Sequence, residues 1–399
     1  MNTPNTASKR IQAIDILRGI TIAGMILVNN PGSWSHIFAP LEHAPWNGMT
    51  PTDLVFPFFM FVMGMCIYLS LLKFDFGCTR TTVYKILRRT VLIYLVGLAI
   101  GWFARFCFRW ADPLENASLV QQIWYTVWSF DKMRLTGVLA RLAVCYGATA
   151  LIAVTVNHRR IPYLIAGLLV VYTIVLFAGN GFAYNETNIL AIVDRAVLTD
   201  AHMYHDNGID PEGLLSTLPA LAHTMLGLSV GRLLFGKRDE PQPTDPATAI
   251  IAGKVVPLFV FGTLLAFGGW LLSYGCPINK KIWSPTYVLM TCGLASVLLA
   301  LLMYAVDVRG RGRWFRPFEV FGANPLFLFV VSDVLSILFC SIRFTVMGHT
   351  DTLLGLSYCH VLSPVFGPTG GSLAYALLFV LLNWCIGYQL YKRRIYIKL

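Results

Sequence analysis

The stretch from Asn29 to Lys73 reads NNPGSWSHIFAPLEHAPWNGMTPTDLVFPFFMFVMGMCIYLSLLK, a polar, turn-rich connection followed by a long apolar run. The apolar part is about twenty residues long, which is enough for a helix to cross roughly 30 Å of hydrocarbon. The polar part gathers Asn, His, Trp and Asp side chains between two such runs. The apolar runs predict a membrane-spanning helical fold, and the polar cluster marks a candidate reaction site.

The composition of the whole chain also predicts a membrane protein. Of its 399 residues, 56% are hydrophobic and only 13% are charged, which is too apolar for a soluble protein of this length. We therefore expect one all-α domain, residues 1–399, folded as a polytopic membrane helix bundle of about ten transmembrane helices. The expected spans lie near residues 11–29, 52–73, 87–106, 136–156, 161–178, 214–234, 250–274, 284–305, 318–341 and 373–391.

Lys and Arg residues fall mainly on alternate connections between these spans. The positive-inside rule therefore assigns the basic connections and both termini to the cytoplasm. The net charge of +11 follows from this bias, so we expect the lipid bilayer as a partner and no nucleic acid. The connections then expected to face the periplasm are residues 30–51, 107–135, 179–213 and 342–372.

Several kinds of site have no motif in this sequence. The nine Cys residues lie mostly inside apolar runs and form no CxxC pair, so we interpret them as packing residues rather than disulfides or metal ligands. The His residues show no spacing typical of a metal site, and we expect no metal. There is no P-loop and no GxGxxG, so no motif indicates ATP or a dinucleotide.

Two titratable side chains in the polar connection are the strongest candidates for chemistry. His43 and Asp53 are ten positions apart. The run Thr50-Pro51-Thr52-Asp53 is typical of a helix N-terminus, so in one interpretation Asp53 caps the second span. In the other interpretation Asp53 orients the His43 imidazole, which acts as a base. Both interpretations can hold together.

Charged residues within apolar runs are costly in a membrane and are therefore functional candidates. Asp15 and Arg18 lie three positions apart on the first span and can also form a structural ion pair. Arg141 lies inside the fourth span, and Arg134 lies just before it. With further basic residues near the cytoplasmic ends of spans, these cations suit a phosphate-bearing ligand. The further residues are Arg10, Arg88 and Arg89.

Sequence blocks spread over most of the chain form a recognisable series. In order they are Arg10-x4-Asp15-x2-Arg18-Gly19, Val28-Asn29, His43-Ala44-x-Trp46-Asn47-Gly48, Asp53-Leu54-Val55-Phe56-Pro57, Arg134-Leu-Thr-Gly-Val-Leu-Ala-Arg141, Asp210-Pro-Glu-Gly-Leu-Leu-Ser-Thr217, Asn279-Lys-Lys-Ile-Trp283-Ser284 and Gly322-Ala-Asn324-Pro325. In this order they resemble the heparan-α-glucosaminide N-acetyltransferase family of transmembrane enzymes. The blocks that contain Arg10 to Pro57 are the most specific, and the others support them.

The resemblance implies an acetyltransferase that uses acetyl-CoA from the cytoplasm as cosubstrate and acetylates an amino sugar, of the terminal glucosamine type, on the periplasmic side. It implies that His43 is the active-site histidine, Asp53 its partner and Asn29 an active-site asparagine. It leaves open whether the histidine carries the acetyl group or acts as a base. We also expect the inner membrane of a bacterium as the location, and we allow for a homodimer.

On the same basis we expect two further groups of site residues. Those expected to hold acetyl-CoA are Arg10, Arg18, Arg88, Arg89, Arg141 and Asn324. Those expected to line the outer, sugar-binding side are Trp46, Asn47, Arg134, Asn279, Lys280 and Trp283.

Other functions remain as alternatives to N-acetylation. An O-acyltransferase of envelope polysaccharide would use the same acetyl donor with a hydroxyl acceptor. A sugar transporter would need no acetyl-CoA, although the sequence lacks the internal repeat that many transporters show. A non-catalytic membrane subunit would bind no acetyl-CoA.

Overall fold

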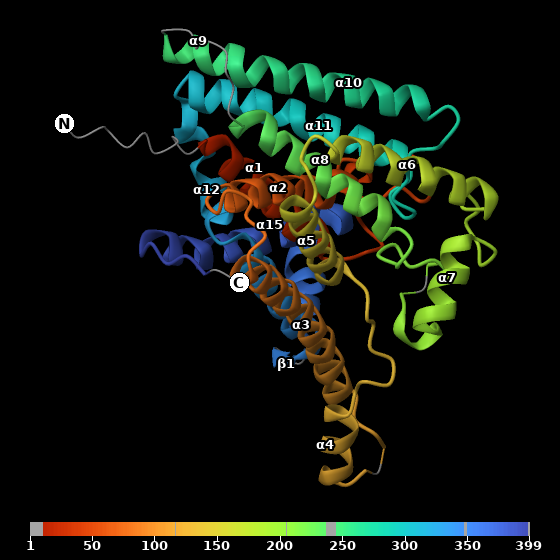
Figure 1. The fold of residues 1–399 in the computed structure, drawn as a ribbon. Helices are drawn as coiled ribbons and strands as arrows, with labels where there is room; N and C mark the ends of the chain where they lie inside the picture. The colour runs from red at the N-terminus through yellow and green to blue at the C-terminus, as the bar shows by residue number, and fades with distance from the viewer. Residues whose placement is uncertain (1–10, 116, 205, 237–244, 347–348, 398–399) are drawn as a thin grey trace.

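The computed structural model describes residues 11–115, 117–204, 206–236, 245–346 and 349–397, and nearly all regular structure in these ranges is helical (Figure 1). The α-helices are α1 (Gln12–Asn29), α2 (Thr52–Leu72), α3 (Arg80–Ala111), α4 (Leu119–Val127), α5 (Val138–Thr155), α6 (Ile161–Ala178), α7 (Ile189–Leu198), α8 (Thr217–Phe235), α9 (Pro246–Ile250), α10 (Val256–Leu272), α11 (Pro285–Met303), α12 (Arg316–Ala323), α13 (Pro325–Ser341), α14 (Leu353–Ser357) and α15 (Ser363–Lys392).

Short elements complete the described structure. Strands β1 (Arg343–Val346) and β2 (His349–Thr352) pair in antiparallel fashion as a small hairpin. The 3₁₀ turns are Ala39–Leu41, Asp200–His202 and Arg311–Phe315, and the π-helical turns are Ile251–Val255, Tyr304–Val308 and Tyr358–Leu362.

Within the described ranges, nine helices are long and apolar enough to cross a membrane, and a tenth span results if α12 and α13 are counted together. This confirms the prediction of an all-α polytopic bundle. Three of these spans contain π-helical turns: α9 continues into α10, α11 extends to Val308, and α14 continues into α15.

The structure corrects the prediction of a single span over residues 318–341, because this region is not one straight helix. Segment 311–323, which ends with α12, and α13 are bent by 73° at their junction. The break falls at Asn324, whose φ of −132° and ψ of 56° are not helical. Pro325 follows it, and a proline disfavours helical backbone in the residue before it. The sequence pair Asn324-Pro325 therefore sets the bend.

The predicted span 87–106 belongs to a longer helix, α3, which contains 32 residues. Its far end carries the short helix α4, and Figure 1 shows α3 leading away from the other helices towards α4. Arg105 and Arg109 fasten this end, because both donate hydrogen bonds to carbonyl groups of the segment 125–132. The connection after α3 is thus partly helical rather than irregular.

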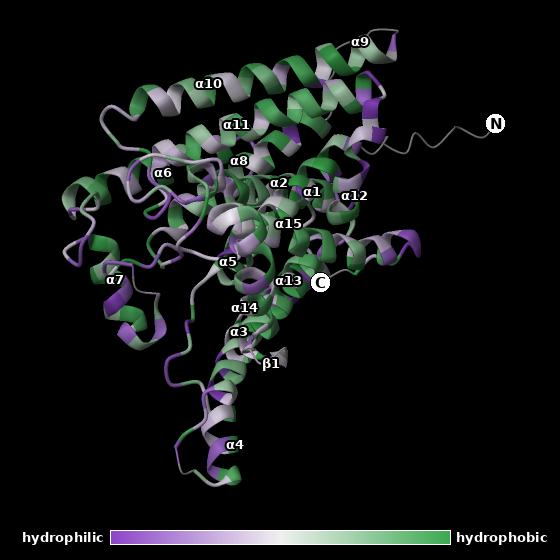
Figure 2. Cartoon of the chain, turned by 180° about the vertical axis from the view of Figure 1, so that it is seen from behind, coloured by the Kyte–Doolittle hydropathy of each residue, from purple (hydrophilic) through white to green (hydrophobic). Residues whose placement is uncertain are grey.

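The core lies where α1, α2, α8 and α11 pack together. Phe61, Ile16 and Met65 are among its fully buried side chains. By contrast, α3 and α10 expose long rows of apolar side chains, such as Leu264 and Phe267 of α10. Figure 2 shows α10 and α11 as mostly hydrophobic along their length. Outward-facing apolar rows of this kind are suited to contact with lipid rather than water.

Small residues allow α2 and α8 to cross closely. A Cβ atom added to Gly64 would meet the carbonyl oxygen of Thr224, and one added to Gly227 would meet the carbonyl oxygen of Phe61. Glycines at the point of contact let two membrane helices approach each other at backbone distance. This crossing holds α2, which carries Asp53 in its first turn, against the centre of the bundle.

We expect Gly227→Ala to lower the stability of the protein, because the new methyl group would displace the backbone of α2. Overpacking of this kind costs about 1–3 kcal/mol. A thermal melt of the detergent-purified protein would measure the loss. Gly268→Ala in α10 is the matched control, since a Cβ atom there meets nothing within 4 Å. Equal melting temperatures for the two variants would contradict the proposed close crossing.

Candidate active site

The carboxylate of Asp53 lies at the first turn of α2 and is almost completely buried, with 1% of the residue exposed. Its Oδ2 accepts hydrogen bonds from the backbone N–H of Ala44 at 3.1 Å and of Thr50 at 3.0 Å. The Thr50 bond is the helix cap that the sequence indicated. The Ala44 bond closes the loop 44–53 back onto the helix, so the carboxylate fixes the path of the loop as well as the helix start.

The other carboxylate oxygen faces the His43 imidazole. Asp53 Oδ1 lies 2.6 Å from His43 Nδ1, so Nδ1–H donates to the carboxylate and Nε2 is the ring nitrogen that can accept a proton. The His43 side chain is 41% exposed, whereas Asp53 is buried. A buried carboxylate thus orients an imidazole whose second nitrogen can reach solvent. The structure brings together the two residues that were predicted to act as a pair.

A third ionisable side chain, Lys280, meets this pair. Its Nζ lies 3.3 Å from His43 Nε2 and 3.4 Å from Asp53 Oδ1. It also approaches Nδ1 to 2.9 Å, so the ammonium lies beside both ring nitrogens and forms an ion pair with the Asp53 carboxylate. Burial lowers the pKa of Lys280, and the negative charges of Asp53 and Glu212 oppose that effect.

The loop that carries Lys280 is fastened to the loop that carries His43. The backbone N–H of Gly48 donates to the carbonyl oxygen of Ile278 at 2.8 Å. Asn279 Nδ2 donates to Asn47 Oδ1 at 3.2 Å, so two residues expected to line a sugar site instead contact each other. Asn279 is completely buried. These bonds explain why Lys280, far away in sequence, arrives beside His43.

Trp283 ends the same turn in a conformation that few large residues adopt, with a φ of 51°. The turn directs its indole inward, where only 1% of the residue is exposed. The ring lies edge-on to Phe56 and Tyr287, with ring centroids 5.5 and 5.2 Å apart. In this arrangement Trp283 cannot stack on a sugar. Its packing supports α2 and α11 from beneath the His43–Asp53 pair.

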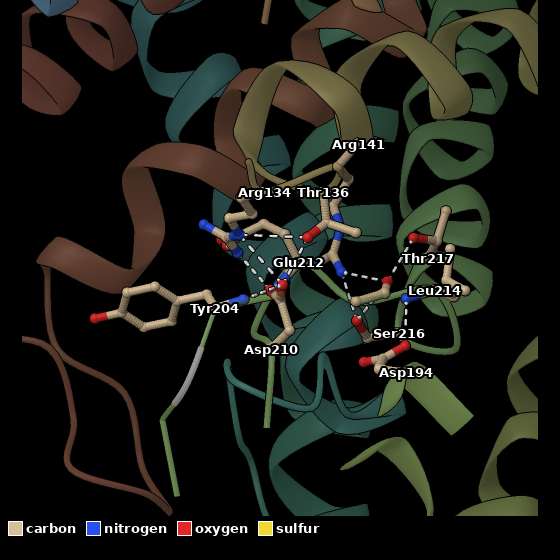
Figure 3. A network of polar contacts seen from close by, with 11 residues as sticks. Arg134, Thr136, Arg141, Asp194, Tyr204, Asp210, Glu212, Leu214, Ser216 and Thr217 are labelled. Atoms are coloured by element: carbon tan, nitrogen blue, oxygen red, sulfur yellow. Dashed lines mark hydrogen bonds and ion pairs between the residues drawn. The ribbon is translucent and has the colours of Figure 1, made fainter. Parts of the chain in front are cut away.

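The Arg134 guanidinium pairs with two acidic residues of the segment between α7 and α8, as Figure 3 shows. Its guanidinium forms ion pairs with Asp210 and Glu212, including a bond from Nε to Asp210 Oδ2 of 3.2 Å. Although burial alone would raise the pKa of Asp210, its hydrogen bonds and charge interaction with Arg134 hold that pKa below the usual range. Arg134 therefore clamps two loops together, and Glu212 is the member of this network whose charge reaches Lys280.

Arg141 lies near the outer end of its span and is 2% exposed. Its Nη2 donates to the carbonyl oxygen of Gly213 at 3.2 Å and to Ser216 Oγ at 2.5 Å, and its guanidinium lies 5.0 Å from the centroid of the Trp283 ring. Asp194 completes this region in Figure 3; burial raises its pKa to about 6. Arg141 thus belongs to the same network as Gly213, Ser216 and Trp283.

Trp46 is the remaining aromatic residue that was expected at the sugar side. One face of its indole stacks on Tyr184, with ring centroids 4.5 Å apart, and its Nε1 donates to the carbonyl oxygen of Phe182 at 2.9 Å. Lys281 in turn bonds to the Tyr184 hydroxyl at 2.7 Å and to Asp206 at 2.6 Å. Trp46 therefore links the His43 loop to the segment 182–206.

The residues expected to hold acetyl-CoA do not gather at one place. Arg18 pairs with Asp15 at 2.8 Å and also donates to the carbonyl oxygen of Gly322. Asn324 holds the C-terminal segment 395–397 through two backbone bonds. Arg88 and Arg89 are exposed on α3, and Arg89 covers the Tyr146 ring. Arg10 lies outside the described residues.

Asn29 does not join the His43 cluster through a hydrogen bond. It is exposed at the end of α1, and its side chain bonds to no residue in the described part of the chain. The neighbouring Asn30 is buried and donates to the carbonyl oxygen of Ile26 at 2.8 Å. Among the described residues, no three His, Cys, Asp or Glu side chains gather in a way that could hold a metal ion.

Comparisons with known proteins show which proteins this chain resembles. No protein-family model matches the sequence. The heparan-alpha-glucosaminide N-acetyltransferase of Mus musculus is 26% identical over 387 residues, which cover 84% of this chain and 55% of the mouse protein. The protein of the same name from Homo sapiens is 25% identical over 391 residues, which cover 82% of this chain and 53% of the human protein. This chain is similar to these two transferases over most of its own length.

The chain spans about half the length of the acetyltransferase relatives that it matches. One residue beside His43 was not assigned to the His43–Asp53 pair by sequence reasoning. Lys280 was expected only to line the sugar side. It stands in a block that resembles the acetyltransferase family, but only the folded loops show that its ammonium lies beside His43. Glu212, which had no role in the sequence analysis, contacts Arg134 and acts on Lys280 through its charge.

We expect Arg134→Gln to lower the melting temperature at neutral pH, because it leaves the buried Asp210 carboxylate without its cation. Removing one partner of a buried ion pair costs about 3–5 kcal/mol. Because the pKa of Asp210 is lowered in the folded protein, this stabilisation is present above pH ~4 and is lost as the pH falls through the folded pKa. The difference from wild type should therefore shrink in acid.

Arg195→Gln is the matched control for this experiment. Arg195 also pairs with two carboxylates of the outer loops, but its partners Glu186 and Asp200 are 71% and 64% exposed. Exposed ion pairs contribute about 0–1 kcal/mol, so this variant should melt close to wild type. A loss for Arg195→Gln as large as that for Arg134→Gln would show that burial of the Asp210 pair is not the cause.

Proposed function

We propose that this multi-pass membrane protein transfers an acetyl group from acetyl-CoA to the amine of a terminal glucosamine-type amino sugar. The observation that carries the proposal is the His43–Asp53–Lys280 cluster, in a chain related over most of its length to proteins named as N-acetyltransferases. An exposed imidazole held by a buried carboxylate is an arrangement suited to accept a proton from an attacking nucleophile.

His43 acts on the acceptor amine in this proposal. The amine must lose a proton to become an amide nitrogen, and an imidazole is a side chain suited to accept that proton near neutral pH. His43 Nε2 takes the proton while Nδ1–H stays bonded to Asp53, whose carboxylate stabilises the imidazolium. The new C–N bond forms, the C–S bond of the thioester breaks, and the thiolate of CoA leaves and takes up a proton.

Lys280 stabilises the negative charge that develops on the thioester oxygen in this scheme. An ammonium group that is already positioned can stabilise such an oxyanion because it needs little reorganisation during the reaction. This role differs from the sugar contact expected from the sequence. Glu212 and Asn47 are then the polar groups that we propose for the acceptor sugar.

The sidedness of the reaction follows from the charge distribution. The basic connections indicate that the His43 loop faces away from the cytoplasm, and we propose the periplasmic side of a bacterial inner membrane. Acetyl-CoA is then supplied from the cytoplasm, where the exposed Arg88 and Arg89 of α3 are available for its phosphates. The pantetheine arm of CoA is long and thin enough to enter a helix bundle while the nucleotide stays near the surface.

The proposal predicts acetyl-CoA-dependent N-acetylation of glucosamine by the purified protein, and a fall of roughly 10²–10⁴-fold in kcat for His43→Ala. The assay would follow release of the CoA thiol together with formation of N-acetylglucosamine. His36→Ala is the control, since His36 lies exposed in the same loop and contacts Ser33 rather than Asp53. Wild-type turnover by His43→Ala would overturn the catalytic assignment. Acetylation of hydroxyl groups alone would favour the O-acyltransferase alternative.

Lys280→Gln should reduce kcat by about 10²–10³-fold while leaving the KM for the sugar nearly unchanged, because the ammonium acts in the transition state. Because burial lowers the pKa of Lys280, the wild-type rate should fall on the alkaline side below the ordinary lysine value of about 10.4, and the variant should lack this fall. Lys281→Gln is the control, since Lys281 bonds to Tyr184 and Asp206. If the substitution changed only the KM for the sugar, Lys280 would instead be assigned to sugar binding.

A further inference from the structure

A basic pocket of about 650 Å³ lies where the end of α15 meets α12, far along the chain from the His43 loop. One wall is formed by α15, a second by segment 313–320, and a third by the C-terminal segment. Its volume falls within the range typical of small-ligand sites. Its lining residues are Arg313, Arg316, Pro317, Val320, Trp384, Tyr388, Tyr391, Lys392, Arg394 and Tyr396.

The third wall is built by Asn324, at the break between α12 and α13. Asn324 is 1% exposed. Its Nδ2 donates to the carbonyl oxygen of Ile395 at 2.8 Å, and its Oδ1 accepts from the backbone N–H of Ile397 at 2.7 Å. The chain turns back after α15 at Arg394, whose φ of 56° is unusual for a residue other than glycine. The pocket is therefore held by specific bonds and is not a gap beside a loose terminus.

The charge of the pocket is strongly one-sided. Four of its lining residues are Lys or Arg, and none is Asp or Glu. No carboxylate of the described residues forms an ion pair with any of these four cations. Glu319 on α12 is bonded instead to Gln12 and Tyr391. Like charges gathered in one cleft repel each other, and a phosphate group would relieve the repulsion while offering oxygens that arginine binds well.

The pocket opens onto a face of α15 that is suited to lipid. Leu377, Leu381, Trp384 and Tyr388 follow one another at helical spacing, and both leucines are 53% exposed. Trp384 stacks on Tyr388 with ring centroids 4.9 Å apart, and its Nε1 donates to the carbonyl oxygen of Pro317. Trp and Tyr at the end of an apolar row are typical of the membrane interface. A row of leucines thus leads from the expected bilayer to the cations.

We propose that this pocket binds the headgroup of an anionic phospholipid. The phosphate lies among Arg313, Arg316, Lys392 and Arg394, the glycerol backbone lies against Trp384 and Tyr388, and one acyl chain follows Leu381 and Leu377. Basic pockets between membrane helices on the cytoplasmic side are typical binding places for anionic headgroups, and the charge distribution assigns this face to the cytoplasm. A nucleotide phosphate would fill the cationic part of the pocket but would make no use of the leucine row.

The test measures lipid binding to the detergent-purified full chain by native mass spectrometry, with phosphatidylglycerol and phosphatidylcholine as probes. Wild type should retain phosphatidylglycerol in preference to phosphatidylcholine. Arg313→Gln/Arg394→Gln removes one cation from each of two walls and should weaken phosphatidylglycerol binding about 30-fold, since each basic residue near a membrane surface contributes roughly one kcal/mol. Arg313→Gln/Arg316→Gln leaves the C-terminal segment intact and should act in the same direction.

The control variant is Arg159→Gln/Arg160→Gln, which removes two exposed cations from the same expected face outside the pocket. It should retain phosphatidylglycerol as wild type does. Equal loss in the control, or no loss in either pocket variant, would overturn the proposal. Displacement of bound phosphatidylglycerol by free CoA would also overturn it, because the pocket would then be a nucleotide site. The glucosamine acetylation assay is run on the same variants, so that a loss of lipid binding can be told apart from a loss of the proposed catalytic function.

Discussion

The buried Asp53 carboxylate needs hydrogen-bond donors, and the groups that supply them determine how the His43 and Lys280 loops are arranged. Asp53 is removed from water at the start of α2, and an unsatisfied charge there would be strongly unfavourable. Its partners come from three directions: the backbone at Ala44 and Thr50, the His43 imidazole, and the Lys280 ammonium. The loop adopts its path because these donors must converge. Helix capping and imidazole orientation are therefore two effects of the same carboxylate, and neither interpretation excludes the other.

The spans could be predicted from the sequence because each needs about twenty apolar residues, a local property that the bilayer imposes. The His43–Asp53 pair could also be predicted, because a helix-start signature and a polar loop lie in one short segment. The position of Lys280 beside this pair could not be predicted, because Lys280 is 237 positions from His43 in the sequence and reaches it only through tertiary loop contacts. The bend at Asn324 follows from the proline after it, yet the continuous hydropathy of the region conceals it.

Charged residues near a site were the least predictable, because sequence does not say which partner each one finds. Arg134 and Arg141 looked alike as intramembrane or near-membrane cations, but one is paired with carboxylates and the other is buried beside Trp283. Trp283 itself was expected to face a sugar, and the left-handed turn directs it into the core. These residues pack around the His43–Asp53 pair or clamp the neighbouring loops, and each lies in one of the other sequence blocks of the resemblance.

The hydroxyl of Tyr287 donates to the backbone carbonyl oxygen of Asp53 at 2.6 Å and so ties the first turn of α11 to the first turn of α2. The turn that carries Lys280 runs directly into α11. A rigid displacement of α11 would therefore carry the ammonium and the carboxylate along together, and their separation would hardly change. The His43 side chain, which is 41% exposed, is therefore the accessible member of a cluster whose other two charges are tied to each other through α11 and α2.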